Sequence, residues 1–347
     1  AQAIGCWLLA STSTPIMPSA DTSADGGSAS AGEASEASVL GTVGNRPMQA
    51  GLPFVNAEGL AVSQAFQAER GDVMISTYPK TGTTWMQQIC HQLRTGGHTD
   101  FEEISEEGIV PWLEVGPSLG QDITLPQQAA PRCFKTHQRL SALSHLEAQG
   151  ARYLCVMRDP TATLLSWFKF EIAHNAPVVA SRDINDFLKS NFVIRGGRDE
   201  FKPYFGGTLW DFYLEYWLCR KFPNVHVVVY ERMRDDLGSQ LSKIADFLLI
   251  PEPNEEKLKK VLELSSMEWM SANGRLFDDH FIGDRLARLP PRGLGAFKPA
   301  AKVGLQVAEQ VNTVMNEESR ETIARMWREI VTPVTGHPTY EAMVADL

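Results

Sequence analysis

Residues 72–85 constrain the fold of this chain more than any other segment. They read Asp-Val-Met-Ile-Ser-Thr-Tyr-Pro-Lys-Thr-Gly-Thr-Thr-Trp, and the short apolar run at 73–75 is typical of a parallel strand that is covered on both faces. The residues at 85–90 continue at helical spacing. A polar turn therefore joins a buried strand to the N-terminus of a helix, which predicts an α/β architecture with a parallel sheet. Along the whole chain, strands are expected near residues 72, 132, 153 and 225, and helices at roughly 138–149, 208–221, 235–248, 254–264 and 305–331.

The turn between this strand and this helix has the composition of an anion-binding site. Gly82 allows the backbone to come close to a ligand, and Thr83 and Thr84 offer hydroxyl and N–H groups at the positive end of the helix dipole. Lys80 adds a full positive charge. This lysine precedes the glycine, whereas the lysine of an ordinary P-loop, GxxxxGK[ST], follows the second glycine. The turn is expected to bind an anion without being a Walker loop.

A second unit of strand, turn and helix occupies residues 152–170. An apolar strand at 153–157 is followed by Arg158, by Asp159 as a helix N-cap and by a proline at the first helical position. Ser166 lies about two turns along that helix. Its hydroxyl reaches the end of the strand only if the helix packs back across the sheet.

A third segment, residues 132–137, forms a short strand that ends in Lys135-Thr136-His137. Because ligands in open α/β sheets collect at the carboxyl ends of the strands, Lys135 and His137 are expected near the bound anion. A neutral imidazole can accept a proton near neutral pH, and a lysine can stabilise negative charge that develops in a reaction. The alternative interpretation of His137 is a polar residue that merely ends a strand.

The eight residues Tyr78-Pro79-Lys80-Thr81-Gly82-Thr83-Thr84-Trp85 resemble the loop with which sulfotransferases bind the 5′-phosphosulfate of 3′-phosphoadenosine 5′-phosphosulfate (PAPS). Residues from about 54 to 300 resemble the soluble PAPS-dependent sulfotransferases as a whole. The resemblance implies a three-layer α/β fold of the P-loop-like sulfotransferase type, with a central, mostly parallel sheet and helices on both faces. It also implies PAPS as donor, 3′-phosphoadenosine 5′-phosphate (PAP) as product, and no metal, because the donor carries its own activated leaving group.

The same resemblance implies roles for single residues. His137 would be the general base, and Lys80, assisted by Lys135, would stabilise charge on the leaving phosphate. Arg158 and Ser166 would bind the 3′-phosphate that distinguishes PAPS from ATP, although an arginine at this place is also explained by a structural ion pair. Further nucleotide contacts would come from Thr81, Gly82, Thr83, Thr84, Trp85, Tyr230, Ser265, Met267, Arg292 and Gly293. The acceptor would be lined by Phe54, Trp112, Phe168 and Phe170, for each of which core packing is an equally good explanation.

The C-terminal part of the chain departs from the family pattern. Where the family has Arg-Lys-Gly, two residues and Gly-Asp-Trp-Lys, residues 291–298 read Pro-Arg-Gly-Leu-Gly-Ala-Phe-Lys, which is shorter by one residue. Pro291 stands where an arginine is usual, so the nucleotide is expected to have fewer charged contacts there. Only the lysine and the valine of the dimerisation segment survive, as Lys298 and Val303. The usual family dimer is therefore not inferred.

Net charge bears on the acceptor. The chain has 32 basic and 42 acidic residues and a formal charge of −10, which leaves little room for the basic surface that nucleic acids and sulfated polysaccharides require. We therefore expect a small-molecule acceptor with a hydroxyl or an amine, and no nucleic acid partner. Glu114 and Glu171, if they lie near the mouth of the site, would favour a cationic amine.

The composition changes sharply along the chain. Residues 1–45 are rich in Ser, Ala, Thr and Gly and contain no basic residue, which indicates a disordered leader before a catalytic domain at 46–347. The apolar patch at residues 3–10 is too short to span a bilayer, so no membrane association is expected. Five cysteines, with no CxxC spacing, are typical of a reducing compartment, and a cytoplasmic protein is expected.

Two other function classes are compatible with a strand, turn and helix of this kind. A nucleotide kinase would share the unit but should carry GxxxxGK[ST], which is absent from the sequence. A non-catalytic nucleotide-binding relative would keep the fold and lose the reactive side chains, whereas Lys80, Lys135 and His137 are all present.

Overall fold

The computed structural model describes residues 57–173, 182–189, 208–286, 299–305 and 307–347. A four-stranded sheet with the strand order β2-β1-β3-β4 lies at its centre, and all three strand pairs are parallel. The strands are β1 Val73–Thr77, β2 Cys133–Thr136, β3 Arg152–Met157 and β4 Val225–Val229. The strands predicted near residues 72, 132, 153 and 225 are thus confirmed.

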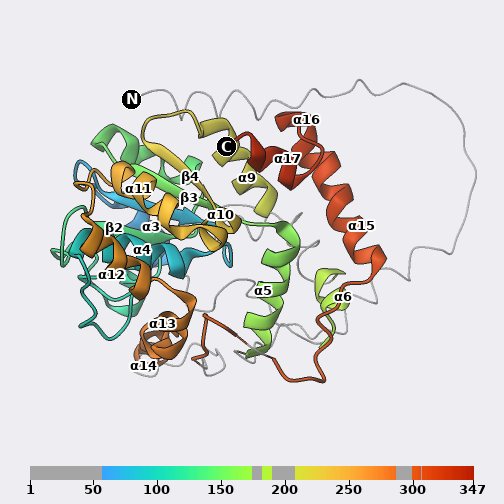
Figure 1. The fold of residues 1–347 in the computed structure, drawn as a ribbon, viewed down its shortest axis with the longest axis horizontal. Helices are drawn as coiled ribbons and strands as arrows, with labels where there is room; N and C mark the ends of the chain where they lie inside the picture. Colours follow the sequence, from blue (N-terminus) through green and yellow to red (C-terminus); the bar gives the residue numbers. More distant parts are fainter. Residues whose placement is uncertain (1–56, 174–181, 190–207, 287–298, 306) are drawn as a thin grey trace, which may run out of the picture.

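Alternate residues of each strand face two different cores, because successive side chains of a strand point to opposite faces. Met74, Phe134 and Tyr153 pack in one core, together with α9 (Leu209–Cys219), α15 (Glu317–Met326) and α17 (Tyr340–Ala345). Val73 and Ile75 pack in the other, together with α4 (Thr83–Thr95), α11 (Leu237–Phe247) and α12 (Glu255–Leu264). Figure 1 shows α9 and the C-terminal helices together, on the side of the molecule away from α12. The three-layer α/β fold is confirmed.

The other elements are short or lie at the rim of the layers. They are α3 Ala57–Ala65, η1 Pro117–Leu119, η2 Leu140–Gln149, α5 Pro160–Ala173, α6 Ile184–Phe187, α10 Tyr230–Asp235, α13 Met267–Ala272, η5 Gly274–Phe277, α14 His280–Leu286, η6 Trp327–Val331 and α16 Thr332–Thr335.

Local capping explains why three of the predicted helices begin where they do. The helices expected at 208–221, 235–248 and 254–264 correspond to α9, α11 and α12. Their N-cap side chains, Thr208, Asp236 and Asn254, accept hydrogen bonds from backbone N–H groups of the first turn, which satisfies donors that a helix start otherwise leaves unpaired.

Two helix predictions need correction. The segment expected as a helix at 138–149 is a 3-10 helix, Leu140–Gln149. The helix expected at 305–331 begins only at Glu317. Upstream of it, the Asn312 backbone donates to the Arg182 carbonyl (2.8 Å) and its own carbonyl accepts from the Ile184 N–H (3.0 Å). These pairings with a distant segment hold Asn312 in an extended conformation that a helix excludes.

Some predictions fall on residues that the structure does not describe. The leader at 1–45 and the site residues Phe54, Arg292 and Gly293 lie outside the described residues. Among the residues that are described, no helix is both long and apolar enough to cross a membrane.

Candidate active site

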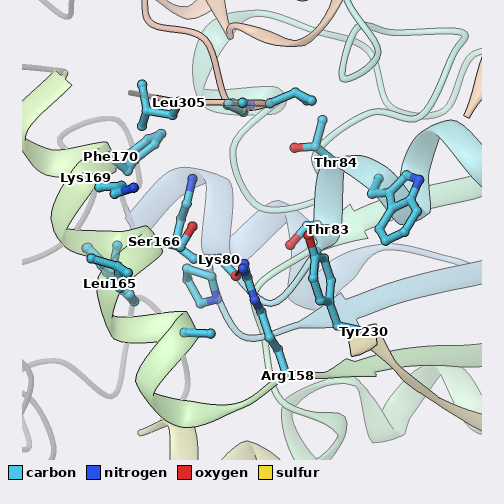
Figure 2. A pocket seen from close by; sticks show the side chains of 18 of the residues that line it. Lys80, Thr83, Thr84, Arg158, Leu165, Ser166, Lys169, Phe170, Tyr230 and Leu305 are labelled. Atoms are coloured by element: carbon cyan, nitrogen blue, oxygen red, sulfur yellow. Dashed lines mark hydrogen bonds between the residues drawn. The ribbon is translucent and has the colours of Figure 1, made fainter. Parts of the chain in front are cut away.

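A pocket of about 350 Å³ opens at the carboxyl ends of the strands. Its lining includes the turn after β1, His137 after β2, Arg158 after β3 and Tyr230 after β4. β1 lies between β2 and β3 in the sheet. The connection from β1 to β2 contains α4 and the connection from β2 to β3 contains η2, and these two elements pack on opposite faces of the sheet. Open α/β sheets bind ligands at such a switch point. Figure 2 shows α5 along one side of this pocket and the N-terminus of α4 across from it.

The turn after β1 has the backbone geometry of a ligand cradle. Lys80 adopts a left-handed conformation (φ 70°), which is uncommon for a residue other than glycine. Gly82, the N-cap of α4, has φ 118° and makes no side-chain cap hydrogen bond. A Cβ at Gly82 would lie 2.8 Å from the Tyr230 ring. Only glycine fits this position, and the helix N-terminus behind it is suited to an anion.

Two lysines of the pocket are held in unusual surroundings. Lys80 Nζ lies 3.9 Å from the centre of the Phe170 ring, and Lys135 Nζ lies 3.5 Å from that of Trp112. Burial, followed by the positive charge of Lys302, lowers the pKa of Lys80 to about 7. Burial likewise lowers the pKa of Lys135 to about 8. A bound anion would favour the protonated form of both lysines.

His137 is buried, and its ring orientation is fixed. Its Nδ1 lies 2.8 Å from the Thr77 carbonyl oxygen, which can only accept, so Nδ1 carries the proton of the neutral ring and Nε2 is the proton-accepting nitrogen. Its backbone N–H donates to Glu114 Oε1 (2.7 Å). Burial, then the charge of Lys135, lowers the pKa of His137 to about 3. The imidazole is therefore neutral, and negative charge bound beside it would raise its basicity.

Several residues predicted to hold the nucleotide lie together in the same pocket. Arg158 Nη1 donates to the Lys80 carbonyl (3.0 Å), and its guanidinium lies 4.2 Å from the centre of the Tyr230 ring. The Tyr230 and Trp85 rings are 5.4 Å apart, and the Trp85 indole N–H donates to the Ser265 carbonyl (2.7 Å). Thr83, Thr84, Ser166 and Met267 also line the pocket.

Three predicted contacts lie elsewhere. The Thr81 hydroxyl donates to the Tyr78 carbonyl within the turn (2.8 Å), and the Ser265 side chain is fully buried; neither residue lines the pocket. The prediction that Phe168 lines the acceptor is wrong, because its ring is fully buried 5.3 Å from that of Phe187. The pocket face of α5 includes Ala162, Leu165, Ser166, Lys169 and Phe170. Phe168 lies on the other side of that helix, with Leu164 one turn before it.

The two glutamates expected near the mouth have different surroundings. Glu114 is fully buried beneath His137, where burial raises its pKa, so it cannot meet an acceptor at the mouth. Glu171 does line the pocket, and its Oε1 accepts from the Trp167 indole N–H (2.6 Å).

The fold also brings charged residues to this region that no sequence motif predicted. Lys302 and Asp279 form an ion pair and line the same pocket. Next to them, Glu103, Asp278 and His280 place their potential metal-ligand atoms within 4.8 Å of one another. His280 Nδ1 lies 2.7 Å from Asp278 Oδ1, so these two side chains already pair with each other.

Comparisons with known proteins agree with this geometry. A sulfotransferase domain model matches residues 70–282. Mouse sulfotransferase 1A1 is 30% identical over 239 residues, which cover 64% of this chain and 75% of that protein. Cytosolic sulfotransferase 12 of Arabidopsis thaliana is 25% identical over 62% of this chain and 67% of its own length.

Among solved structures, mouse sulfotransferase SULT7A1 complexed with PAP has a TM-score of 0.58 at 17% identity, over 80% of this chain and 90% of that chain. Retinol dehydratase in complex with androsterone and PAP has a TM-score of 0.56 at 18% identity, over 79% of this chain and 84% of that chain. These structures show the fold, whereas the sequence matches show the family. The chain therefore belongs to the sulfotransferase family.

Proposed function

We propose that this protein transfers a sulfuryl group from PAPS to a hydroxyl or amine of a small-molecule acceptor. When bound, PAPS supplies a sulfuryl group on an activated leaving phosphate. The observation that carries the proposal is the convergence of Lys80, Lys135, His137 and Arg158 on one pocket beside the Gly82 turn. Burial is the main cause of the lowered pKa values of Lys80 (about 7) and Lys135 (about 8), and a bound polyanion would favour the charged form of both lysines.

Each reactive side chain has a chemically distinct task. His137 Nε2 takes the proton of the acceptor as its oxygen or nitrogen bonds to sulfur, while Nδ1 remains bound to the Thr77 carbonyl. Lys80, with the N–H groups at the start of α4, stabilises the charge that develops on the phosphate oxygen as its bond to sulfur breaks. Lys135, whose ammonium group lies over the Trp112 ring, assists in this stabilisation.

Other residues of the same pocket recognise the nucleotide. Trp85, Tyr230 and the half-exposed Met267 offer flat or apolar surface to a base. Arg158 and Ser166 would bind the 3′-phosphate, and the presence of both in the lining of the pocket supports this assignment. Arg158 Nε is buried without a hydrogen-bond partner among the described residues, and a ligand oxygen would satisfy it.

The acceptor end of the pocket is mainly apolar. Phe170, Leu165, Val303, Leu305 and Trp112 contribute to it, which favours a small molecule with an apolar body. The androsterone held by retinol dehydratase is an acceptor-sized molecule of this type.

We further propose a cytoplasmic location, which the name of the cytosolic relative from Arabidopsis thaliana supports. We also propose a catalytic domain at 46–347 preceded by the leader at 1–45.

Replacing Arg158 by Ala tests the nucleotide assignment. The unaltered protein should bind PAP much more tightly than adenosine 5′-phosphate, because only PAP carries the 3′-phosphate. A hydrogen bond to a charged group contributes about 1.5–3 kcal/mol, so the variant should lose about 10- to 100-fold in affinity for PAP and much less for adenosine 5′-phosphate. Isothermal titration of both nucleotides measures the two changes.

A matched control for this variant is Arg328→Ala. Arg328 is exposed, ion-paired with Glu321 and outside the pocket, so its removal should leave both affinities unchanged. Equal affinities of the unaltered protein for the two nucleotides would contradict the PAPS assignment.

A further inference from the structure

Lys302 is a further lysine of the pocket, in addition to Lys80, Lys135 and Lys169. It belongs to the described segment 299–305, and only 7% of its side chain is exposed. It forms an ion pair with Asp279, whose side chain is 5% exposed. Both residues line the pocket that holds Lys80 and His137. The sequence gives Lys302 no motif of its own.

The Lys302 ammonium group has donor capacity that the protein does not use. Apart from the ion pair with Asp279, Nζ has no hydrogen-bond partner among the described residues. An ammonium group has three N–H donors, and a buried donor without an acceptor is costly. Because the group borders the pocket, a ligand oxygen is the natural partner for the remaining donors.

Asp279 holds Lys302 in this position. Its backbone has a left-handed conformation (φ 58°), and its N–H donates to Oε2 of the fully buried Glu103 (3.0 Å). A non-glycine residue keeps such a conformation only where the surrounding contacts impose it. The ion pair is therefore a fixed part of the pocket wall and not a flexible surface contact.

Electrostatic coupling places Lys302 at the reactive end of the pocket. Burial is the main cause of the low pKa of Lys80, and Lys302 is the largest of its charged causes. The charge of Lys302 also contributes, after larger causes, to lowering the pKa values of Lys135 and His137. The ammonium group therefore lies near the three residues that the proposed transfer uses.

We propose that Lys302 binds an oxyanion at the reactive end of the pocket, with Asp279 as its positioning residue. The oxyanion is either the sulfuryl group of the donor or an anionic group carried by the acceptor. This inference rests on the proposed function, because it assigns Lys302 to the ligands of the same site. It adds a lysine from the C-terminal part of the chain to Lys80 and Lys135.

The decisive comparison is between PAPS and PAP, which differ by the sulfuryl group. Equilibrium titrations without acceptor, monitored by tryptophan fluorescence, give the dissociation constant of each nucleotide. They are made with the unaltered protein, with Lys302→Met and with the double variant Lys302→Met/Asp279→Asn. The double variant removes both charges, so no buried carboxylate is left unpaired. Lys302→Arg keeps the charge, and Lys189→Met removes an exposed, ion-paired lysine outside the pocket.

If Lys302 binds the sulfuryl group, the double variant should lose about tenfold in affinity for PAPS relative to PAP, as expected for one hydrogen bond to a charged group. Lys302→Arg should restore part of that loss, and Lys189→Met should lose nothing. If Lys302 instead binds the acceptor, the PAPS to PAP ratio stays unchanged. The double variant, loaded with PAP, should then bind 4-hydroxybenzoate more weakly than the unaltered protein does, with no change for methyl 4-hydroxybenzoate.

Two results overturn the inference, and in both the ratio of the PAPS and PAP dissociation constants is the same in the double variant as in the unaltered protein. In the first, the double variant also keeps the selectivity of the unaltered protein for 4-hydroxybenzoate over its methyl ester. In the second, neither of these two probes binds the unaltered protein. Such a result leaves the proposed function intact, provided that the unaltered protein binds PAP. Failure of the unaltered protein to bind either nucleotide would overturn the proposed function, and this inference with it.

Discussion

His137→Ala is expected to lower the transfer rate by about 10²–10⁴-fold, the usual contribution of a general base, while PAP binding stays close to that of the unaltered protein. Nδ1 is bound to the Thr77 carbonyl, so the ring presents Nε2 as its proton acceptor. The low pKa of His137, about 3, keeps the ring neutral at ordinary assay pH. Consequently kcat/KM should not fall near pH 6.5 through protonation of this residue.

A series of acceptors with different pKa values measures this effect. An acceptor that is already ionised at the assay pH needs no base and should be partly spared in the variant. Thermal unfolding shows whether the variant is folded, and His145→Ala, on η2 and outside the pocket, should retain full activity. If the transfer rate of His137→Ala falls by the same factor for every acceptor, or does not fall, then His137 positions the substrate or fills space. Another group is then the base.

Lys80→Ala is expected to slow transfer by about 10²–10³-fold, the effect of removing a donor that stabilises transition-state charge. PAP affinity should change less, because Arg158 and the α4 N-terminus remain. Single-turnover kinetics with PAPS measures the chemical step directly. Lys80→Met keeps an unbranched side chain beside Phe170 but removes the charge, so it should be equally slow if the charge is what matters. Near-normal turnover in both variants would show that Lys80 is only a turn residue.

Proton uptake on nucleotide binding tests the electrostatics of Lys80 independently. In the free protein its pKa is lowered to about 7, so the side chain is mostly neutral at pH 8. An anionic ligand favours the charged form and raises this pKa, so a proton is taken up on binding. PAP affinity should therefore weaken as the pH rises above about 7, by up to tenfold per pH unit for one linked proton. Titrations in buffers of different ionisation enthalpy measure the uptake, which Lys80→Met should reduce.

The fold and the turn after β1 could be predicted because their signals are local. Val73 and Ile75 mark a buried strand, and Gly82 between Lys80 and Thr83 marks the turn at a helix N-terminus. Each of these signals spans a few neighbouring residues. Such a pattern can be recognised without knowing which distant segments pack against it.

The errors arose where distant segments decide the outcome. Positions 168 and 170 are both phenylalanine, so the residue type does not distinguish them. The packing of α5 places Phe170 in the pocket and Phe168 in the core. Asn312 is held extended by pairing with a segment more than a hundred residues earlier. Lys302 and Lys80 line one pocket although more than two hundred residues separate them in the sequence. No local periodicity carries such information.

The most direct test of the account is the thermal stabilisation of the unaltered protein by PAP compared with ATP and Mg²⁺. At about 100 times its dissociation constant, a ligand that binds only the folded state stabilises it by roughly 2.7 kcal/mol. We expect PAP to reach this effect at a concentration at which ATP with Mg²⁺ produces little shift, because ATP lacks the 3′-phosphate that Arg158 and Ser166 are proposed to bind. Stabilisation by ATP with Mg²⁺ that equals or exceeds that by PAP would contradict the assignment of the pocket to PAPS and favour a nucleotide kinase.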